Sequence, residues 1–325
     1  MVNADFLSRR FGKPFRQTGK NEFYTQYAAG SGKEHFLVTV YRVFPGIELL
    51  YHCLQAGSFT ALGQPDPNLL EIDHCRTGQV ESRKKNSCCF FSAGDLAAFG
   101  GPLPESTVTL TGGSYTGISI LIHTAQTPQC LSCLLDDVTV SPTLLLQKFS
   151  CPGKAYIARS NNSIAHIFSE LYTVPEEIKK GYFKVKVLEL LLFLSALEVQ
   201  RTEVNRHYAT VNQTQLAHKI AKHLKQNLNR RITIEQLSDQ FHTSPTGIKN
   251  GFKAVYGTSI YSFARRQKML AAAKDLCTTN CSILEIAGKY GYDNGSKFAK
   301  AFGQSLGLTP GNYRKLHSGK PPLAE

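Results

Sequence analysis

The sequence contains no apolar run long enough to cross a membrane. The strongest run, at 187–194, is short and includes Glu189, whereas a spanning helix needs about 20 mostly apolar residues. The first ten residues lack the apolar core of a secretory signal peptide. These absences predict a soluble, cytoplasmic protein that does not associate with a membrane.

The sequence also gives little support for structural disulfides. Its nine cysteines are an odd number, and cytoplasmic proteins rarely form such bonds. Cys130 and Cys133 have the spacing of a redox pair or of half a zinc site, but no second pair follows at zinc-ribbon distance. A thiol-sensing role stays open, and we predict no bound cofactor.

Positive charge is concentrated at one end of the chain. From residue 211 onward there are 17 lysines and arginines against six acidic residues, a net charge of +11, whereas the preceding 210 residues carry only +2. Clustered positive charge is typical of a protein that binds a polyanion and gains affinity from counterion release. This distribution favours nucleic acid as the partner of the carboxyl-terminal part.

The carboxyl-terminal part repeats one pattern, a short amphipathic helix, a turn and a basic helix. In the first copy, Thr233 and Gln236 have the spacing of a capping box, so a helix is expected to start there. After a turn at 242–243, Ser244 can cap a second helix whose first residue is Pro245. The first copy therefore predicts a helix-turn-helix motif.

The second copy has the same order of signals. Ser282 and Glu285 form another capping box, Gly291 can end the helix in a left-handed conformation, and Asp293 or Asn294 can cap the next helix. One such pattern occurs in many helical hairpins. Two matching copies in one basic segment favour DNA binding over a merely solvated lysine surface.

Each predicted second helix has one apolar face and one polar face. The apolar residues, at three- and four-residue spacing, are expected to face the core: Ile248, Phe252, Val255, Phe298, Phe302 and Leu306. Lysine contacts phosphate or guanine and asparagine pairs with adenine, so the polar faces suit a DNA-reading helix. The candidate DNA-binding residues are Thr246, Lys249, Asn250, Lys253, Ser296, Lys297 and Lys300.

The segment between the two copies predicts one continuous helix at 259–277, because it is rich in helix formers and lacks proline and internal glycine. A helix of about 20 residues is roughly 30 Å long. Successive major-groove faces lie about 34 Å apart on one side of DNA. One chain could therefore contact two adjacent segments of the major groove.

Residues 215–316 resemble the DNA-binding domain of the AraC family of bacterial transcription regulators. The motifs that carry the resemblance are Ile286-Ala287, Gly291-Tyr292, Ser296 with Phe298, Phe302, Gly307 with Thr309-Pro310, and Tyr313-Arg314. By position, the resemblance places base- and backbone-contacting sites at Thr246, Lys249 and Asn250 in the first reading helix. In the second it places them at Ser296, Lys297 and Lys300.

Four positions depart from the family pattern. Lys268 stands where arginine is common, and Gly303 stands where a basic residue often follows the second phenylalanine. Gly247 and Gly251 lie inside the first reading helix, and each costs roughly 1 kcal/mol of helix stability relative to alanine. We therefore expect the first reading helix to be loose until DNA orders it.

The amino-terminal part predicts an antiparallel β structure. Short alternating runs lie at 35–41, 47–54, 69–76, 79–83, 88–91, 107–111 and 114–123, with turn signals such as Pro45-Gly46, Thr77-Gly78 and Gly112-Gly113 between them. Many AraC-like regulators carry a cupin-like barrel that binds a small effector, and a barrel of this size can enclose one small ligand. The resemblance does not name the effector.

Three histidines, His52, His74 and His123, fall on predicted strands. A cupin metal site would use such residues, but metal sites need convergent ligands, which scattered histidines do not establish. We predict no metal site. Their convergence would favour the alternative that the barrel is a metal enzyme fused to a DNA-binding module.

Helical spacing returns at 163–171 and 176–200, where the apolar stripe includes Tyr182, Val185, Leu188, Leu192 and Leu197. Such a stripe suits packing against the barrel or against a second subunit, and the AraC resemblance implies that the chain dimerises through this segment. The predicted fold class is therefore α+β. Its parts are a β-rich effector domain at 1–140, a helical dimerisation segment at 141–200, a linker at 201–212 and an all-α domain with two helix-turn-helix motifs at 213–318.

Together these features predict a sequence-specific transcription regulator that responds to a small-molecule effector and does no chemistry. Its expected partners are double-stranded DNA, the effector and a second copy of the chain. RNA polymerase is a candidate partner if the protein is an activator. A second alternative is a constitutive DNA-binding protein whose barrel serves only for assembly, which effector-dependent DNA binding would exclude.

Overall fold

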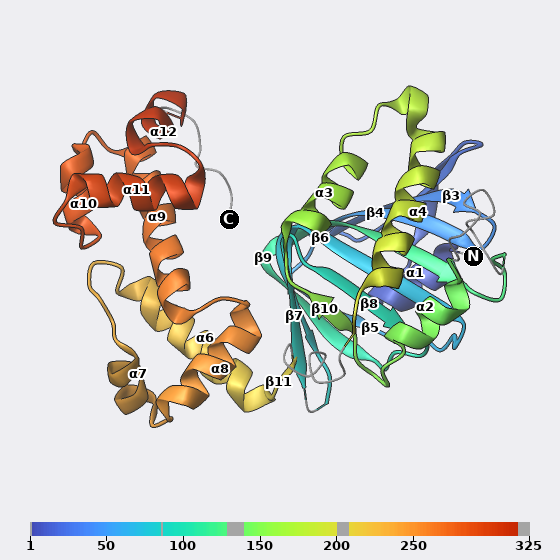
Figure 1. The fold of residues 1–325 in the computed structure, drawn as a ribbon, viewed down its shortest axis with the longest axis horizontal. Helices are drawn as coiled ribbons and strands as arrows, with labels where there is room; N and C mark the ends of the chain where they lie inside the picture. Colours follow the sequence, from blue (N-terminus) through green and yellow to red (C-terminus); the bar gives the residue numbers. More distant parts are fainter. Residues whose placement is uncertain (1, 86, 129–139, 200–207, 318–325) are drawn as a thin grey trace. The chain divides into compact units, whose positions relative to one another are not determined.

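The chain folds into two compact units, Met1–Tyr208 and Ala209–Glu325 (Figure 1). The structure, a computed structural model, describes residues 2–85, 87–128, 140–199 and 208–317. The predicted β-rich domain and helical segment both fall in the first unit, and the predicted DNA-binding domain falls in the second. Cys130 and Cys133, and most of the predicted linker at 201–212, lie outside the described residues.

The first unit is built on an antiparallel sheet whose strands follow the order β1-β2-β3-β4-β9-β6-β7-β11, with β5, β8 and β10 paired beside this path. The bounds are β1 Arg16–Lys20, β2 Tyr24–Ala29, β3 His35–Phe44, β4 Ile47–Gln55, β5 Ser58–Ala61, β6 Leu69–Arg83, β7 Cys88–Ser92, β8 Leu96–Gly100, β9 Ser106–His123, β10 Tyr156–Ala158 and β11 Tyr208–Ala209. Strands β6 and β9, of 15 and 18 residues, are the longest and form the centre of the sheet.

Two of the predicted turns are bends within single strands. Thr77-Gly78 lies inside β6, where the register with β9 shifts and Gly78 has φ +92°. Gly112 and Gly113 lie inside β9, with φ +84° and +75°. Glycine adopts positive φ without a Cβ clash, so the chain bends at these positions while the pairing continues on both sides. The predicted pairs 69–76 with 79–83 and 107–111 with 114–123 are therefore one strand each.

The sheet is not closed into the predicted barrel. Among the described strands, β1 and β11 end the path and do not pair with each other. Closure requires that every strand edge be paired. Strand β1 is instead mostly exposed and carries an irregularity between Gln17 and Gly19, a feature that protects a free edge from further pairing.

The two faces of the sheet contribute to two cores, because successive side chains of a strand point to opposite sides. One core includes Leu70 and Ile72 of β6 and the helices that follow the sheet, α2 Pro142–Phe149, α3 Asn162–Leu171 and α4 Lys179–Ala196. The other includes Leu69 and Cys75 together with α1 Ala4–Phe11. Helices thus cover one face with a thick layer, and α1 packs against the other.

Helix α4, which follows a short 3-10 helix at Glu176–Ile178, buries mainly residues outside the predicted apolar stripe. Its buried residues are Phe183, Lys186, Val187, Leu190, Leu191 and Leu194. Of the predicted stripe, Val185 is 63% exposed, and Leu188 is only half-buried. Leu192 and Leu197 of the stripe pack against the core of the first unit. Because apolar residues surround α4, spacing alone cannot select the face that packs on the sheet, and packing of the outward residues on a second subunit stays a prediction.

The second unit is helical in its described residues. Its helices are α6 Val211–Gln226, α7 Ile234–Phe241, α8 Pro245–Tyr256, α9 Ile260–Thr278, α10 Ile283–Lys289, α11 Gly295–Leu306 and α12 Pro310–His317. Helix α6 begins at Val211, directly after a capping box formed by Thr210 and Gln213. The all-α fold predicted for this part is confirmed.

Within the described ranges, the helices fall short of the length and apolar character that a bilayer crossing requires.

Candidate DNA-binding surface and ligand cavity

The first helix-turn-helix motif consists of α7 and α8, and its predicted caps are present. Thr233 and Gln236 cap each other's backbone at the start of α7. His242 ends α7 in a left-handed conformation with φ +49°. The Ser244 hydroxyl then accepts a hydrogen bond from the Gly247 backbone, and Pro245 occupies the first turn of α8. The turn therefore follows from the local sequence.

Helix α8 presents the predicted residues outward. Ile248, Phe252 and Val255 are buried. The four candidate DNA-binding residues of this helix are all exposed: Thr246, Lys249, Asn250 and Lys253. Since the apolar face packs on the unit's own core, the opposite face is available to a partner.

The second motif, formed by α10 and α11, has the same construction. Ser282 and Glu285 make a capping box, and Gly291 has φ +79° after the end of α10. The Asn294 side chain accepts hydrogen bonds from the backbone of residues 296 and 297, which selects Asn294 over Asp293 as the cap of α11. The three candidate residues of this helix are exposed: Ser296, Lys297 and Lys300.

Helix α9 connects the two motifs, as the sequence predicts. It has 19 residues, a length of roughly 28 Å at the α-helical rise. Met269, Ala272, Ala273 and Leu276 pack against α10, α11 and α12 in one cluster. Arg314 of α12 donates to the backbone carbonyls of Leu276 and Cys281. The second motif is thus built onto the carboxyl-terminal half of α9.

The two glycines of α8 do not interrupt the helix. Gly247 and Gly251 both lie within Pro245–Tyr256, and Gly251 is buried. A methyl group on Gly251 would meet Gln213 of α6 at 3.7 Å, an ordinary contact. Close packing against α6 therefore does not require glycine at this position, and the expected looseness of α8 without DNA stays a prediction.

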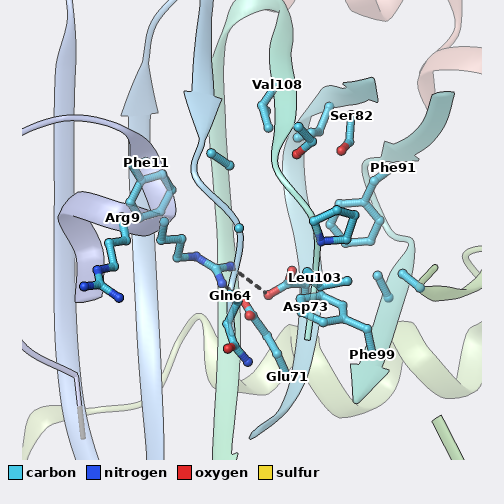
Figure 2. A pocket seen from close by; sticks show the side chains of 18 of the residues that line it. Arg9, Phe11, Gln64, Glu71, Asp73, Ser82, Phe91, Phe99, Leu103 and Val108 are labelled. Carbon is cyan, nitrogen blue, oxygen red and sulfur yellow. Dashed lines mark hydrogen bonds and ion pairs between the residues drawn. The ribbon is translucent and has the colours of Figure 1, made fainter. Parts of the chain in front are cut away.

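The first unit contains a cavity of about 570 Å³ on the face of the sheet that α1 covers. This volume lies within the range of small-molecule sites. Its lining is mostly apolar and includes Phe59 and Tyr115. Figure 2 shows Phe11, Phe91 and Phe99 in the lining together with a few charged groups. The cavity is therefore the candidate effector site.

Buried polar groups form a connected network at this cavity. Arg10 of α1 forms an ion pair with Glu71, and its Nη2 lies 3.5 Å from Asp73 Oδ1 and 3.3 Å from Ser119 Oγ. Ser119 donates to Asp73 and accepts from His52 Nε2 at 2.7 Å. Burial raises the pKa of Asp73, although Arg10 and Ser119 oppose the shift. Burial also lowers the pKa of His52 well below its usual value, so this histidine is neutral.

The three strand histidines do not converge. His52 lies in the network just described, and His123 lines the cavity between Glu48 and Asp66. His74 belongs to the opposite face, where its ring stacks on Phe168 at 4.1 Å. Among the described residues, no group of three histidine, cysteine or acidic side chains is placed to hold a metal ion. The geometry that the metal-enzyme alternative requires is therefore not present in that part of the chain.

Sequence reasoning missed Arg10, Glu71 and Asp73 as candidate site residues. Helix α1 could have been found, because Asn3 is an N-cap, Gly12 ends the helix with φ +60°, and Leu7 and Phe11 have helical spacing. Glu71 and Asp73 are acidic residues at alternate positions near the start of β6, beside Leu69, Leu70 and Ile72. Alternation places them on one face, but only the fold shows that this face borders a cavity.

Comparison with known proteins agrees with the second unit's architecture. A family model described as a helix-turn-helix domain matches residues 237–316. The HTH-type transcriptional regulator YdiP of Escherichia coli K12 is 28% identical over 177 residues, which are 53% of this chain and 57% of YdiP. PqrA of Proteus vulgaris, named as a probable transcription factor, is 30% identical over 98 residues, which are 30% of this chain and 80% of PqrA.

A solved structure, described as a probable AraC family transcriptional regulator from Rhodopseudomonas palustris CGA009, aligns with 32% of this chain and 98% of its own, with 24% identity and a TM-score of 0.30. The match to YdiP spans little more than half of that relative's length. The matched segment of PqrA, by contrast, includes most of that protein. On the family model, the similarity to PqrA and the two capped helix-turn-helix motifs, the chain belongs to the AraC family of DNA-binding transcriptional regulators.

Proposed function

We propose that this protein is a sequence-specific, effector-responsive regulator of transcription that acts in the cytoplasm. The observation that carries the proposal is the pair of exposed, lysine-bearing helix faces on α8 and α11, each placed by a capped helix-turn-helix motif. Such a face can enter the major groove while the apolar face holds the helix on its own unit. The length of α9 would place the two motifs in adjacent segments of the DNA major groove.

Within this proposal the exposed side chains have two roles. Thr246, Lys249 and Asn250 on α8, and Ser296, Lys297 and Lys300 on α11, are candidates for contacts to base edges and neighbouring phosphates. Lys253 lies nearer the carboxyl end of α8. It is the candidate for a contact to phosphate alone, because recognition helices read bases mainly with their amino-terminal residues.

The effector is proposed to bind in the cavity of the first unit. The cavity combines an apolar lining with a small number of buried polar groups, the composition typical of sites for small molecules. A cavity with these properties favours an effector-responsive regulator over one in which the sheet domain serves only for assembly. The sheet need not close into a barrel to enclose a ligand of this size.

Self-association and contact with RNA polymerase complete the proposal. The outward face of α4, with Val185 63% exposed and Leu188 half-buried, is the candidate surface for a homodimer. Two copies would join two DNA-binding units and raise the affinity for paired sites. RNA polymerase would be a further partner if the bound protein activates transcription.

Selection of bound duplexes from a random DNA library tests the proposal. The full chain is expected to enrich a defined sequence. A variant with Lys249, Lys297 and Lys300 changed to alanine is expected to lose that enrichment. A matched control removes the same charge from the first unit, through exposed Lys20, Lys33 and Lys180. If the control loses enrichment equally, or the wild type enriches no sequence, the proposed function is wrong.

A further inference from the structure

The carboxylate of Glu71 has an unused oxygen in the cavity. Its side chain is 1% exposed and lines the cavity. Arg10 pairs with Oε1, whereas Oε2 has no hydrogen-bond partner among the described residues. A buried carboxylate oxygen without a partner is costly, so such an atom commonly marks a place that a ligand or an ordered water occupies.

The charges around Glu71 are unbalanced. Arg10 is the one cation that forms ion pairs with both Glu71 and Asp73 in the described part of the chain. The adjacent His52 is neutral, since burial lowers its pKa, and Ser119 carries no charge. Two carboxylates therefore share a single guanidinium, which leaves this end of the cavity with an excess of negative charge when both are ionised.

Aromatic rings line the space beside these carboxylates. Phe99 is the register partner of Glu71 in the β6–β8 pair, and its side chain lines the cavity. Figure 2 shows Phe99 next to Glu71 and Asp73, with Phe91 further along the same cavity. Ring faces attract cations through their quadrupole and also bury apolar carbon. Both features suit a ligand with a cationic head and an apolar body.

We propose that the cavity binds a small molecule that carries a protonated amine, amidine or guanidine on an apolar or aromatic skeleton, with the cationic head donating to Glu71 Oε2. The ligand head lies beside Arg10 rather than replacing it, because one carboxylate has enough lone-pair sites for both donors. This inference rests on the proposed function, since it names the chemical class of the effector.

Two basic residues of the lining must be weighed against this assignment. Arg9 is exposed and lies on α1 next to Arg10. Lys84 donates to the backbone carbonyl of Gly153, and burial lowers its pKa, which weakens it as a fixed positive charge. Neither residue removes the excess negative charge at Glu71 and Asp73. An anionic ligand at Lys84 or Arg10 is the competing outcome of the test.

Three probes with the same skeleton and different heads test the charge preference: phenylbutylamine, phenylbutanol and phenylbutyrate. Their binding to the full chain is measured by isothermal titration calorimetry at neutral pH. The amine is expected to bind about tenfold to a hundredfold more tightly than the alcohol, the range of a hydrogen bond to a charged group. Tighter binding of the acid, or no binding of the amine, overturns the proposal.

Substitutions test whether Glu71 is the residue that produces the preference for the amine. Glu71→Gln keeps the size of the side chain and removes its charge, so the preference for the amine over the alcohol is expected to disappear. Asp73→Asn is expected to reduce this preference and provides a second variant if Glu71→Gln does not fold. The matched control is Glu48→Gln, which changes a buried carboxylate that accepts from the Val2 backbone. If Glu48→Gln loses the preference and Glu71→Gln keeps it, the assignment of Glu71 is wrong.

A second measurement separates this inference from the proposed function. DNA binding by the full chain is measured with and without each probe. If the amine binds through Glu71 but DNA binding does not change, the ligand class stands and the effector role fails. If the acid instead binds and alters DNA binding, effector control stands and the cationic ligand class is overturned.

Discussion

Lys268, in the middle of α9, donates a hydrogen bond of 3.0 Å to the backbone carbonyl of Tyr290, the residue that ends α10. The bond ties the connecting helix to the turn before α11. Asp275, about two turns further along α9, accepts from both Lys289 and the Tyr290 hydroxyl. Three hydrogen bonds from two residues of α9 therefore fix the end of α10, and with it the starting point of the second reading helix.

Lys268→Met is expected to destabilise the DNA-binding unit by about 1 to 2 kcal/mol, because it removes a charged donor from the backbone carbonyl of the buried residue Tyr290. Urea unfolding of the full chain measures the change. Lys268→Arg, which restores the residue common in the family, is the control and should retain most of the stability. Equal losses in both variants would mean that the contact with Tyr290 contributes nothing.

The sequence predicted the second unit well because its structure is specified locally. Thr233, Ser244 and Ser282 each cap a helix with partners at most three residues away, so the signal lies within a short window. The first unit depends on long-range pairing. Whether Gly78 reverses the chain or only bends it is decided by strand β9, which continues to pair on both sides of it.

The cavity could not be predicted for a related reason. Arg10 and Glu71 are 61 positions apart in the sequence, and only the packing of α1 on the sheet brings them together. The face of α4 is a similar case. Because Leu188 and Leu190 are equally apolar, the choice of Leu190 for the core depends on how the helix docks.

Gly251→Ala is expected to stabilise the DNA-binding unit by about 0.5 to 1 kcal/mol, because alanine loses less conformational freedom in a helix. The added methyl group would make only an ordinary contact with Gln213. Thermal unfolding measures the effect. Gly291→Ala is the control and should destabilise the unit, because φ is +79° at Gly291 and any residue with a Cβ is strained in that conformation. Destabilisation by Gly251→Ala would show that α8 packs on α6 more tightly than these distances indicate.

His74 is expected to make the first unit sensitive to acid. Burial lowers its pKa to about 4, whereas the unfolded chain has the ordinary histidine value of about 6.5. Between these values the unfolded state binds a proton that the folded state does not. The free energy of unfolding therefore decreases as the pH falls from about 6.5 to about 4, and above this window the neutral His74 no longer lowers it.

His74→Phe should keep the stack on Phe168 and remove this titration. Between pH 7 and pH 5 the variant should lose roughly 2 kcal/mol less stability than the wild type. Urea unfolding at the two pH values gives the difference directly. An identical pH dependence in both proteins would contradict the role of His74.

Leu188→Glu is expected to weaken self-association without unfolding the chain. Leu188 lies on the outward face of α4, away from the residues buried against the sheet, and a carboxylate in a dimer interface would be buried without a partner. Sedimentation velocity at micromolar concentration measures the shift toward monomer. Ser195→Glu adds the same charge to exposed Ser195 at the end of α4 and should leave association unchanged. A wild type that sediments as a monomer would end the dimer proposal.

The final prediction distinguishes base reading from phosphate binding. Asn250 and Lys300 are exposed on α8 and α11, and loss of a base contact at either position should cost roughly 1 to 3 kcal/mol of binding free energy and relax preference at one or two operator positions. Lys253→Ala should instead weaken binding to all sequences alike and lower the salt slope by about one unit.

Lys300→Ala is expected to be more damaging than Asn250→Ala, because one glycine, Gly303, lies within three residues of Lys300 in α11, whereas both Gly247 and Gly251 lie within three residues of Asn250 in α8. Glycine raises the free energy needed to form a helix, so each DNA contact made from α8 should contribute less net binding free energy than a contact made from α11. Binding isotherms on the enriched operator and on its single-base variants, at several salt concentrations, measure affinity, preference and slope together. Unchanged affinity and preference in Lys300→Ala would mean that α11 does not read DNA through this face.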